Sequence, residues 1–218
     1  MARRATAKVS FRALIVLAVV ALGVYALDQI SKFLVVTSLT EGDVVRVLDD
    51  VLQLHFVRNP GAAFSLASGM TWIFSLIATG VVVFIVWFAG RIRSVAWSVV
   101  FGLLLGGVLG NLTDRLLREP GFGVGHVVDF ISTPWMIPAI YNVADMSIVV
   151  SMVIFMFLTI RGVGLDGVRT SDSAATRDAA PNGGAAPAAD PDSASNPPSR
   201  SDAATDGLSG PSSTEPAR

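Results

Sequence analysis

Two aspartates, Asp129 and Asp145, stand at the edges of apolar segments in a chain that is otherwise strongly hydrophobic. Asp129 interrupts the run Val-Val-Asp-Phe, and Asp145 comes just before a long apolar stretch. Two neighbouring carboxylates can share one proton, so that one takes a proton from water while its protonated partner polarises a carbonyl group. The two residues therefore predict hydrolysis by a pair of aspartates.

Asp145 also has a purely structural explanation. Asn142 can cap the helix that begins there, and an acid three residues later complements the positive end of the helix dipole. Capping does not explain Asp129, which precedes a segment with Pro134 and Pro138 that we expect to kink and to return the chain toward Asp145. We therefore interpret the two acids as a pair.

Other catalytic motifs are missing from the sequence. It has no Gly-x-Ser-x-Gly or His-Glu-x-x-His pattern, and His55 and His126 are isolated. The chain has no cysteine, which excludes disulfides and a thiol nucleophile. We expect no metal and no cofactor. Acids in small membrane bundles also carry protons, so a proton-coupled transporter remains an alternative, as does a structural membrane scaffold.

The composition is that of an integral membrane protein, with 52% hydrophobic and 15% charged residues. A helix needs about 20 apolar residues to cross a hydrocarbon core about 30 Å thick. Four segments meet this requirement, at residues 11–36, 71–90, 94–117 and 142–161. The expected fold class is an all-α membrane protein, a four-transmembrane-helix bundle that forms one domain over residues 1–165.

The charged residues bear on orientation and partners. Basic residues before the first segment, between the second and third, and after the fourth favour two cytoplasmic termini. They are Arg3, Arg4, Lys8, Arg12, Arg91, Arg93, Arg161 and Arg169. A net charge of −1 without a basic patch argues against a nucleic-acid partner. Residues 166–218, rich in Ala, Ser, Pro, Asp and Gly, predict a disordered cytoplasmic tail.

A cleaved signal peptide over residues 1–27 is the alternative to a first membrane span. We favour the span because the apolar run is longer than a signal peptide needs, and because Asp28 and Lys32 continue it in helical register. These two charges lie four residues apart, where opposite charges meet on a helix. Because ionisable groups at membrane depth usually face a polar cavity, we expect the pair to form part of the site wall.

The segment from residue 44 to residue 58 predicts a small extracytoplasmic β-hairpin, because apolar and polar residues alternate around Asp49-Asp50. It ends in a turn at Asn59-Pro60-Gly61. Two interpretations of this turn stay open: a plain chain reversal, or a place where the Asn59 amide and the bare backbone of residues 61–64 bind an extended chain.

The third apolar segment combines small and polar residues. Gly102, Gly106 and Gly110 recur every four residues with Gly107 beside them, a pattern that lets another helix approach closely in a membrane. Beyond them, one polar cluster is expected from Asn111, Asp114 and Arg115. Two interpretations of Arg115 stay open: its side chain extends to the membrane interface and pairs with Asp114, or it forms part of the functional site.

Taken in order, five motifs resemble one family, lipoprotein signal peptidase (signal peptidase II). They are Asp28-Gln-Ile-Ser-Lys32, Asn59-Pro-Gly-Ala-Ala-Phe64, Gly106-Gly-Val-Leu-Gly-Asn-Leu-Thr-Asp-Arg115, Val128-Asp-Phe130 and Asn142-Val-Ala-Asp145. The resemblance covers roughly residues 11–161. One small departure is Tyr141, where the family more often has Phe.

The resemblance implies a bacterial cytoplasmic-membrane aspartyl peptidase that removes signal peptides from diacylglyceryl-modified prolipoproteins, cutting before the lipidated cysteine. It implies no metal or cofactor. We also expect contact with membrane lipid, a monomeric enzyme and a site near the extracytoplasmic face. Asp129 and Asp145 match its catalytic pair. Residues that match its substrate-binding or supporting positions are Asp28, Lys32, Asn59, Gly61, Gly107, Asn111, Asp114, Arg115, Asn142 and Ala144. Since Asp145 lies near a helix N-terminus, we expect it to be the ionised base and Asp129 the acid.

Overall fold

The computed structural model describes residues 10–61 and 71–168. All of them belong to the first of the two units into which the chain divides, Met1–Ala180. The predicted tail lies outside the described residues from residue 169 onward, as do the first basic residues and the 62–64 part of the loop motif.

Four long helices confirm the expected membrane bundle: α1 (Phe11–Ser38), α2 (Thr71–Ala89), α3 (Val95–Leu117) and α4 (Val143–Ile160). Their bounds differ from the expected ranges by at most two residues. Each helix is long and apolar enough to cross a membrane. Large apolar side chains such as Leu22 on α1, Val83 on α2 and Val153 on α4 are more than 60% exposed, as suits a surface that contacts lipid. The chain is therefore a multi-pass membrane protein.

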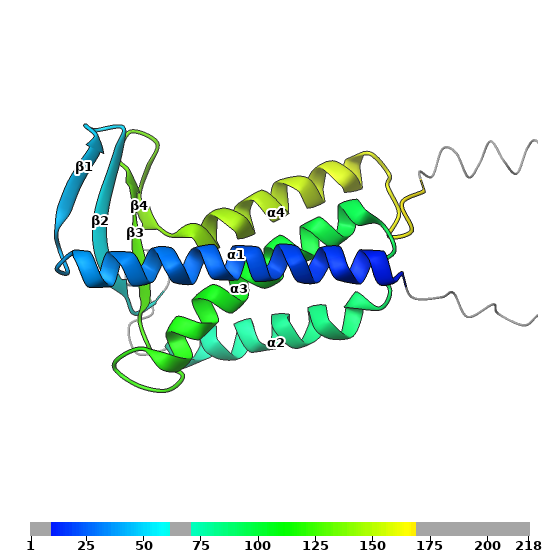
Figure 1. The fold of residues 1–218 in the computed structure, drawn as a ribbon, viewed down its shortest axis with the longest axis horizontal. Helices are drawn as coiled ribbons and strands as arrows, with labels where there is room; N and C mark the ends of the chain where they lie inside the picture. The colour runs from blue at the N-terminus through cyan, green and yellow to red at the C-terminus, as the bar shows by residue number, and fades with distance from the viewer. Residues whose placement is uncertain (1–9, 62–70, 169–218) are drawn as a thin grey trace, which may run out of the picture. The chain divides into compact units, whose positions relative to one another are not determined.

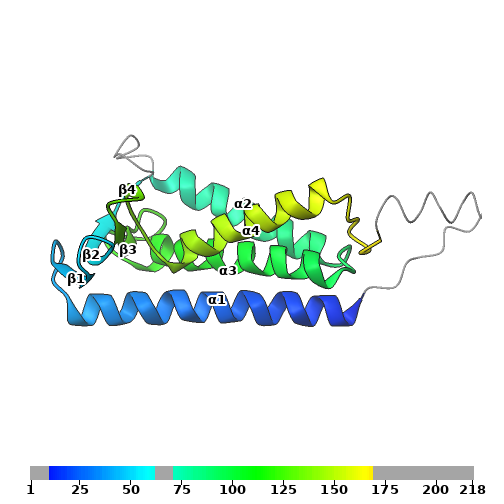
Figure 2. The ribbon, with the colours of Figure 1, turned by 90° about the horizontal axis from the view of Figure 1, so that it is seen from above.

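Helix α3 is the most buried of the four and contacts each of the other three. Figure 2 shows it next to α1, with α2 and α4 on its other side. One apolar core joins all four helices through residues such as Leu17, Ile85, Phe101 and Leu158. Because lipid offers no hydrophobic driving force for helix association, close packing at small residues has to stabilise the bundle instead.

The glycine face of α3 does this packing, as the sequence predicted. A Cβ atom added at Gly106 would lie 2.6 Å from the carbonyl oxygen of Ala21 on α1, and one at Gly102 would lie 2.9 Å from that of Leu17. A Cβ at Gly107, on another side of α3, would lie 2.6 Å from the carbonyl oxygen of Ala144 on α4. These glycines let α1 and α4 approach α3 closely.

An antiparallel four-stranded sheet with the order β1-β2-β3-β4 lies at one end of the helices (Figure 1). The strands are β1 (Val44–Leu48), β2 (Leu52–Asn59), β3 (Val127–Thr133) and β4 (Ile137–Tyr141). The β1–β2 hairpin confirms the predicted one. The start of α1, the α2–α3 turn and the end of α4 lie at the opposite end of the helices.

The second hairpin, β3–β4, is absent from the sequence-based prediction, which expected a kinked segment there. Pro134 instead stands in a turn closed by a hydrogen bond of 2.9 Å from the Met136 N–H to the Thr133 carbonyl. Pro138 lies on β4, an edge strand, where a missing N–H is tolerated. The sheet is fixed to α1 by a second apolar core that includes Val35, Phe56 and Val128.

Candidate active site

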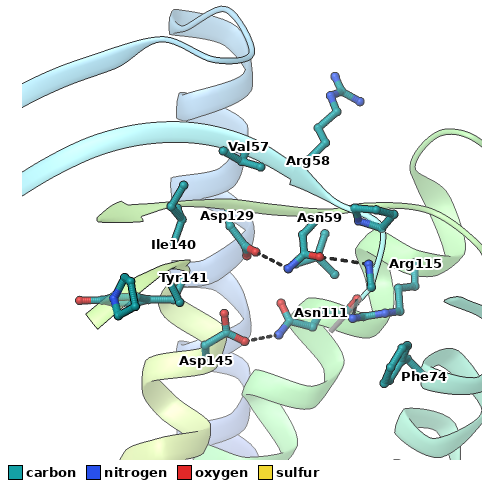
Figure 3. Close-up of a pocket in the computed structure, with 15 residues that line it drawn as sticks. Val57, Arg58, Asn59, Phe74, Asn111, Arg115, Asp129, Ile140, Tyr141 and Asp145 are labelled. Carbon is teal, nitrogen blue, oxygen red and sulfur yellow. Dashed lines mark hydrogen bonds between the residues drawn. The ribbon is translucent and has the colours of Figure 1, made fainter. Parts of the chain in front are cut away.

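A cavity of about 680 Å³ lies where the sheet meets the ends of α2, α3 and α4. Asp129 and Asp145 both line it, although sixteen positions separate them in the chain (Figure 3). The other lining residues are Val57, Arg58, Asn59, Pro60, Gly61, Phe74, Asn111, Arg115, Val127, Pro138, Ala139, Ile140 and Tyr141. The structure therefore brings the two predicted acids to one hollow.

Asp129 is placed by strand pairing. It lies opposite Val57 in the β2–β3 ladder, and because side chains alternate along a strand, Asn59 lies on the same face as Val57. The Asn59 side-chain amide donates a hydrogen bond of 2.9 Å to Oδ2 of Asp129. Asp129 is only 4% exposed.

The surroundings of Asp129 favour its protonated form. Burial raises the pKa of Asp129 from its ordinary value of 3.8 to about 6. The negative charge of Asp145 also raises the pKa, whereas the hydrogen bonds from Asn59 and Asn142 and the charge of Lys32 lower it. A carboxyl group with this pKa keeps its proton to a higher pH than an ordinary aspartate.

Asp145 stands in the first turn of α4, where Asn142 is the N-cap. The Asn142 side chain accepts a hydrogen bond of 3.0 Å from the Asp145 N–H, and the Asn142 N–H donates one of 3.2 Å to Oδ2 of Asp145. This capping box is the structural role expected for Asp145. The Asn142 side-chain amide also donates a hydrogen bond of 2.6 Å to Oδ1 of Asp129. One fully buried side chain thus links both acids.

Asn111, on α3, holds the other oxygen of Asp145 through a hydrogen bond of 2.7 Å from its side-chain amide. Its own side-chain oxygen accepts from Nζ of Lys32 at 2.9 Å and from the Asn142 amide at 3.1 Å. This fixes which end of the Asn111 amide faces Asp145, because an ammonium group can only donate.

Asp28, Lys32 and Asp114 form a fully buried ion cluster behind the cavity. Nζ of Lys32 lies 2.8 Å from Oδ2 of Asp28 and 2.8 Å from Oδ2 of Asp114. Asp28 accepts a hydrogen bond of 2.9 Å from the Ala144 N–H at the start of α4, and Asp114 accepts one of 3.2 Å from the Val128 N–H on β3. The cluster therefore ties α1, α3, α4 and β3 together.

This placement corrects the expectation that Asp28 and Lys32 form part of the site wall, because neither residue lines the cavity. The three donor hydrogens of the Lys32 ammonium point instead to Asp28, Asp114 and Asn111. The pair supports the cavity from behind, through the residues that do line it.

Arg115 lines the cavity and does not pair with Asp114, so that alternative for Arg115 is wrong. Adjacent residues on a helix do not face each other, and Asp114 pairs instead with Arg118, four positions on, at 2.6 Å. Within the described part of the chain, Arg115 makes no ion pair and its buried Nε has no hydrogen-bond partner. Its guanidinium places a positive charge in the cavity, 5.8 Å from the Phe74 ring.

The small residues of the predicted site shape its backbone. The Gly61 N–H donates a hydrogen bond of 3.0 Å to the side-chain oxygen of Asn59, which orients the Asn59 amide toward Asp129. Ala144 is fully buried, and Gly107 lies against it. Neither of these last two lines the cavity. Phe74 and β4 also form cavity walls, which the sequence did not predict, because the residue pattern of β4 is only a weak strand signal.

No group of three or more His, Cys, Asp or Glu side chains within residues 10–61 and 71–168 is arranged to hold a metal ion. The polar groups that line the cavity include two carboxylates, two amides and the guanidinium of Arg115. Such a set can donate and accept protons and bind carbonyl groups.

Comparison with known proteins agrees with this architecture. A relative from Leifsonia xyli subsp. xyli, a lipoprotein signal peptidase, is 63% identical over 168 residues, which are 77% of this chain and 77% of the relative. A lipoprotein signal peptidase from Rhodococcus jostii is 45% identical over 71% of this chain and 77% of its own length. Two solved structures, each described as a bacterial membrane enzyme, align with a TM-score of 0.60 at 29% identity. The first alignment covers 72% of this chain and 93% of the solved chain, and the second covers 71% of this chain and 97% of the solved chain.

Fold and cavity together define a polytopic membrane protein with a polar site at one end of its helices. The family model described as signal peptidase (SPase) II matches residues 20–161. The chain belongs to the signal peptidase II family.

Proposed function

We propose that this protein is a lipoprotein signal peptidase of the aspartic type, which hydrolyses the peptide bond before the lipidated cysteine of diacylglyceryl-modified prolipoproteins. One observation carries the proposal. Asp129 and Asp145 line one cavity and are joined through the Asn142 side chain, in a chain 63% identical to a lipoprotein signal peptidase.

The two acids take different roles in this proposal. Asp145 accepts hydrogen bonds on both of its carboxylate oxygens, from Asn111 and from the backbone of Asn142, and it lies at the positive end of α4. Asp129, with a pKa near 6, carries the shared proton. Asp145 is then the general base and Asp129 the general acid.

The reaction follows from these protonation states. Asp145 removes a proton from water as the water oxygen attacks the scissile carbonyl carbon, while Asp129 gives its proton to the carbonyl oxygen. The result is a neutral gem-diol. When it collapses, Asp145 passes its proton to the leaving amine, Asp129 takes a proton back from a diol hydroxyl group, and the C–N bond breaks. The enzyme returns to its starting state with one proton on the pair.

Other residues of the cavity position the substrate. The guanidinium of Arg115 has unused donors and can bind a substrate carbonyl beside the acids. Asn111 and Asn59 hold the carboxylates in place. The exposed apolar faces of the helices offer a surface for the acyl chains of the substrate and for membrane lipid. The enzyme in this proposal is a monomer.

The proposed orientation places both termini in the cytoplasm and the cavity at the extracytoplasmic face of a bacterial cytoplasmic membrane. Arg12, Arg91, Arg93 and Arg161 belong to the end of the helices opposite the sheet, as the bias of basic residues toward the cytoplasm requires. In this orientation the sheet and the cavity would face the side on which exported prolipoproteins arrive.

The test is cleavage of a purified diacylglyceryl-modified prolipoprotein by the detergent-solubilised full chain. The expected product ends immediately before the lipidated cysteine, as mass spectrometry would show, and the same substrate without its diacylglyceryl group should be cleaved far more slowly. The variant Asp50→Asn, at the exposed β1–β2 turn, is the matched control and should keep full activity. Absence of cleavage by folded wild-type protein, together with pH-driven uptake into liposomes, would favour a transporter instead.

A further inference from the structure

Strand β4 contributes four consecutive residues, Pro138 to Tyr141, to the wall of the cavity. Successive side chains of a strand point to opposite faces of a sheet, so one face alone would contribute only every second residue. An unbroken run means that the strand also presents its backbone to the cavity. Figure 3 shows Ile140 and Tyr141 on the strand that leads into the helix carrying Asp145.

The backbone of β4 is incompletely paired. It is an edge strand, so within the described residues only β3 pairs with it. The ladder joins Ser132 to Ile140 and Thr133 to Ile137. This register gives no β3 partner to Pro138 or Ala139, which form a bulge. Bulged residues are left out of the ladder, and bulges are frequent beside active sites.

Ala139 lines the same cavity as the two acids, and its backbone N–H and C=O have no partner residue in the ladder, whereas Pro138 has only a C=O. Ala139 is half-buried, with a methyl side chain that leaves room beside the strand. Backbone groups that are withdrawn from water and unpaired are costly. A ligand that supplied both a donor and an acceptor at the right spacing would satisfy them, and an extended peptide does this.

We propose that the free edge of β4 at Ala139 is a strand-pairing site, where the signal-peptide residues that precede the scissile bond bind in an extended conformation through backbone hydrogen bonds. The inference rests on the proposed peptidase function and adds how the substrate backbone is held. Because β4 ends at Tyr141 and α4 presents Asp145 one turn later, a peptide paired with this edge leads its backbone to both carboxylates.

Backbone pairing has a signature that side-chain recognition lacks. In an extended peptide, successive N–H groups point in opposite directions, so only every second one can reach the edge of β4. A set of diacylglyceryl-modified peptides, each carrying one N-methyl group at one of the four residues before the cysteine, tests this. The side chains stay the same throughout the set.

Pairing predicts that N-methylation at positions two residues apart lowers kcat/KM by about tenfold, while methylation at the positions between them has much less effect. Binding of the same peptides to the folded Asp129→Asn variant should follow the same alternation, which separates binding from chemistry. Equal losses at all four positions, or no loss at any, would overturn the inference. Failure of the wild-type protein to cleave the unmethylated peptide would overturn the peptidase function as well.

The protein side offers a matched pair of variants. Ala139→Pro removes the N–H, whereas Ala139→Gly keeps it and removes only the methyl group. If the edge pairs with substrate, the proline variant should lose far more cleavage of the unmethylated peptide than the glycine variant. Both should unfold near the wild-type temperature, since the ladder register does not use residue 139. Retained cleavage by a folded proline variant would contradict the role of the Ala139 N–H.

Discussion

Removal of the Asn59 amide is expected to shift the pH dependence of cleavage. The Asn59 side chain donates 2.9 Å to Oδ2 of Asp129, and this hydrogen bond lowers the pKa of Asp129 against the larger effect of burial. Without it, as in Asn59→Ala, the charged form of Asp129 loses a donor, so the pKa should rise above its value of about 6.

The size of the shift follows from the energy of the bond. A hydrogen bond to a charged group contributes about 1.5–3 kcal/mol, and one pKa unit corresponds to about 1.4 kcal/mol. Because the cavity is open and water can take the place of the lost amide, the lower end applies, which gives a rise of about one unit. If Asp129 must be protonated for catalysis, activity is lost as pH rises through this pKa. The alkaline limb of the profile should therefore move up by about one unit.

The assay is kcat/KM for a diacylglyceryl-modified peptide over a pH series, with the position of the limb, rather than its height, as the readout. Gln53→Ala is the matched control, because Gln53 is another amide on β2 but donates only to Asp49 and Asp50 at the hairpin turn. Its limb should stay in place. A limb that is unmoved in folded Asn59→Ala, or that moves to lower pH, would refute the assignment of the shared proton to Asp129.

Three further predictions concern stability, each measured by thermal unfolding in detergent. Because the pKa of Asp129 is raised from 3.8 to about 6 in the folded state, its protonation stabilises the fold at low pH, and this contribution is lost as the pH rises from about 4 to about 6. The free energy of unfolding of wild type should therefore fall by about 3 kcal/mol over this window relative to that of Asp129→Asn. Parallel curves of stability against pH for the two proteins would contradict this. Lys32→Met leaves two fully buried carboxylates without their ammonium partner and should lower the free energy of unfolding by about 3–5 kcal/mol. A melting temperature near that of wild type would contradict this. Gly106→Ala forces α1 away from α3 and should lower the free energy of unfolding by about 1–3 kcal/mol. The control Gly80→Ala, where nothing lies within 4 Å of the new methyl group, should be neutral or stabilising. Equal effects of the two substitutions would argue against close packing at Gly106.

The helices could be predicted from the sequence because an apolar run of about 20 residues has few structural options in lipid. The glycine spacing on α3 likewise has a direct physical consequence, close helix approach, and the structure confirms it at Gly102 and Gly106. The β3–β4 hairpin could not be predicted with the same ease. Its strands are short, and the pairing that stabilises β3 is with β2, about 70 residues earlier in the chain.

The site was partly predictable for the same reason. Residue type alone marked Asp129 and Asp145, since acids beside apolar segments are costly without a role. Which partners they have depends on the β2–β3 register, and the link that Asn142 makes between them follows from the fold alone. The partner of Asp114 could have been predicted from helix geometry. Arg118 lies four residues from Asp114, the spacing at which opposite charges meet on a helix, whereas Arg115 is the adjacent residue.

Cleavage rates of Asp129→Asn, Asp145→Asn and the double variant, measured in single-turnover experiments on a diacylglyceryl-modified prolipoprotein, test the central claim most directly. If the two acids act as one catalytic unit, each single variant should lose at least about 10⁴-fold in rate, and the double variant should lose little more than either one. Folding of each variant is checked by its unfolding temperature, with Asp50→Asn as the control. Substantial cleavage by either folded single variant, or multiplicative losses in the double variant, would contradict the account.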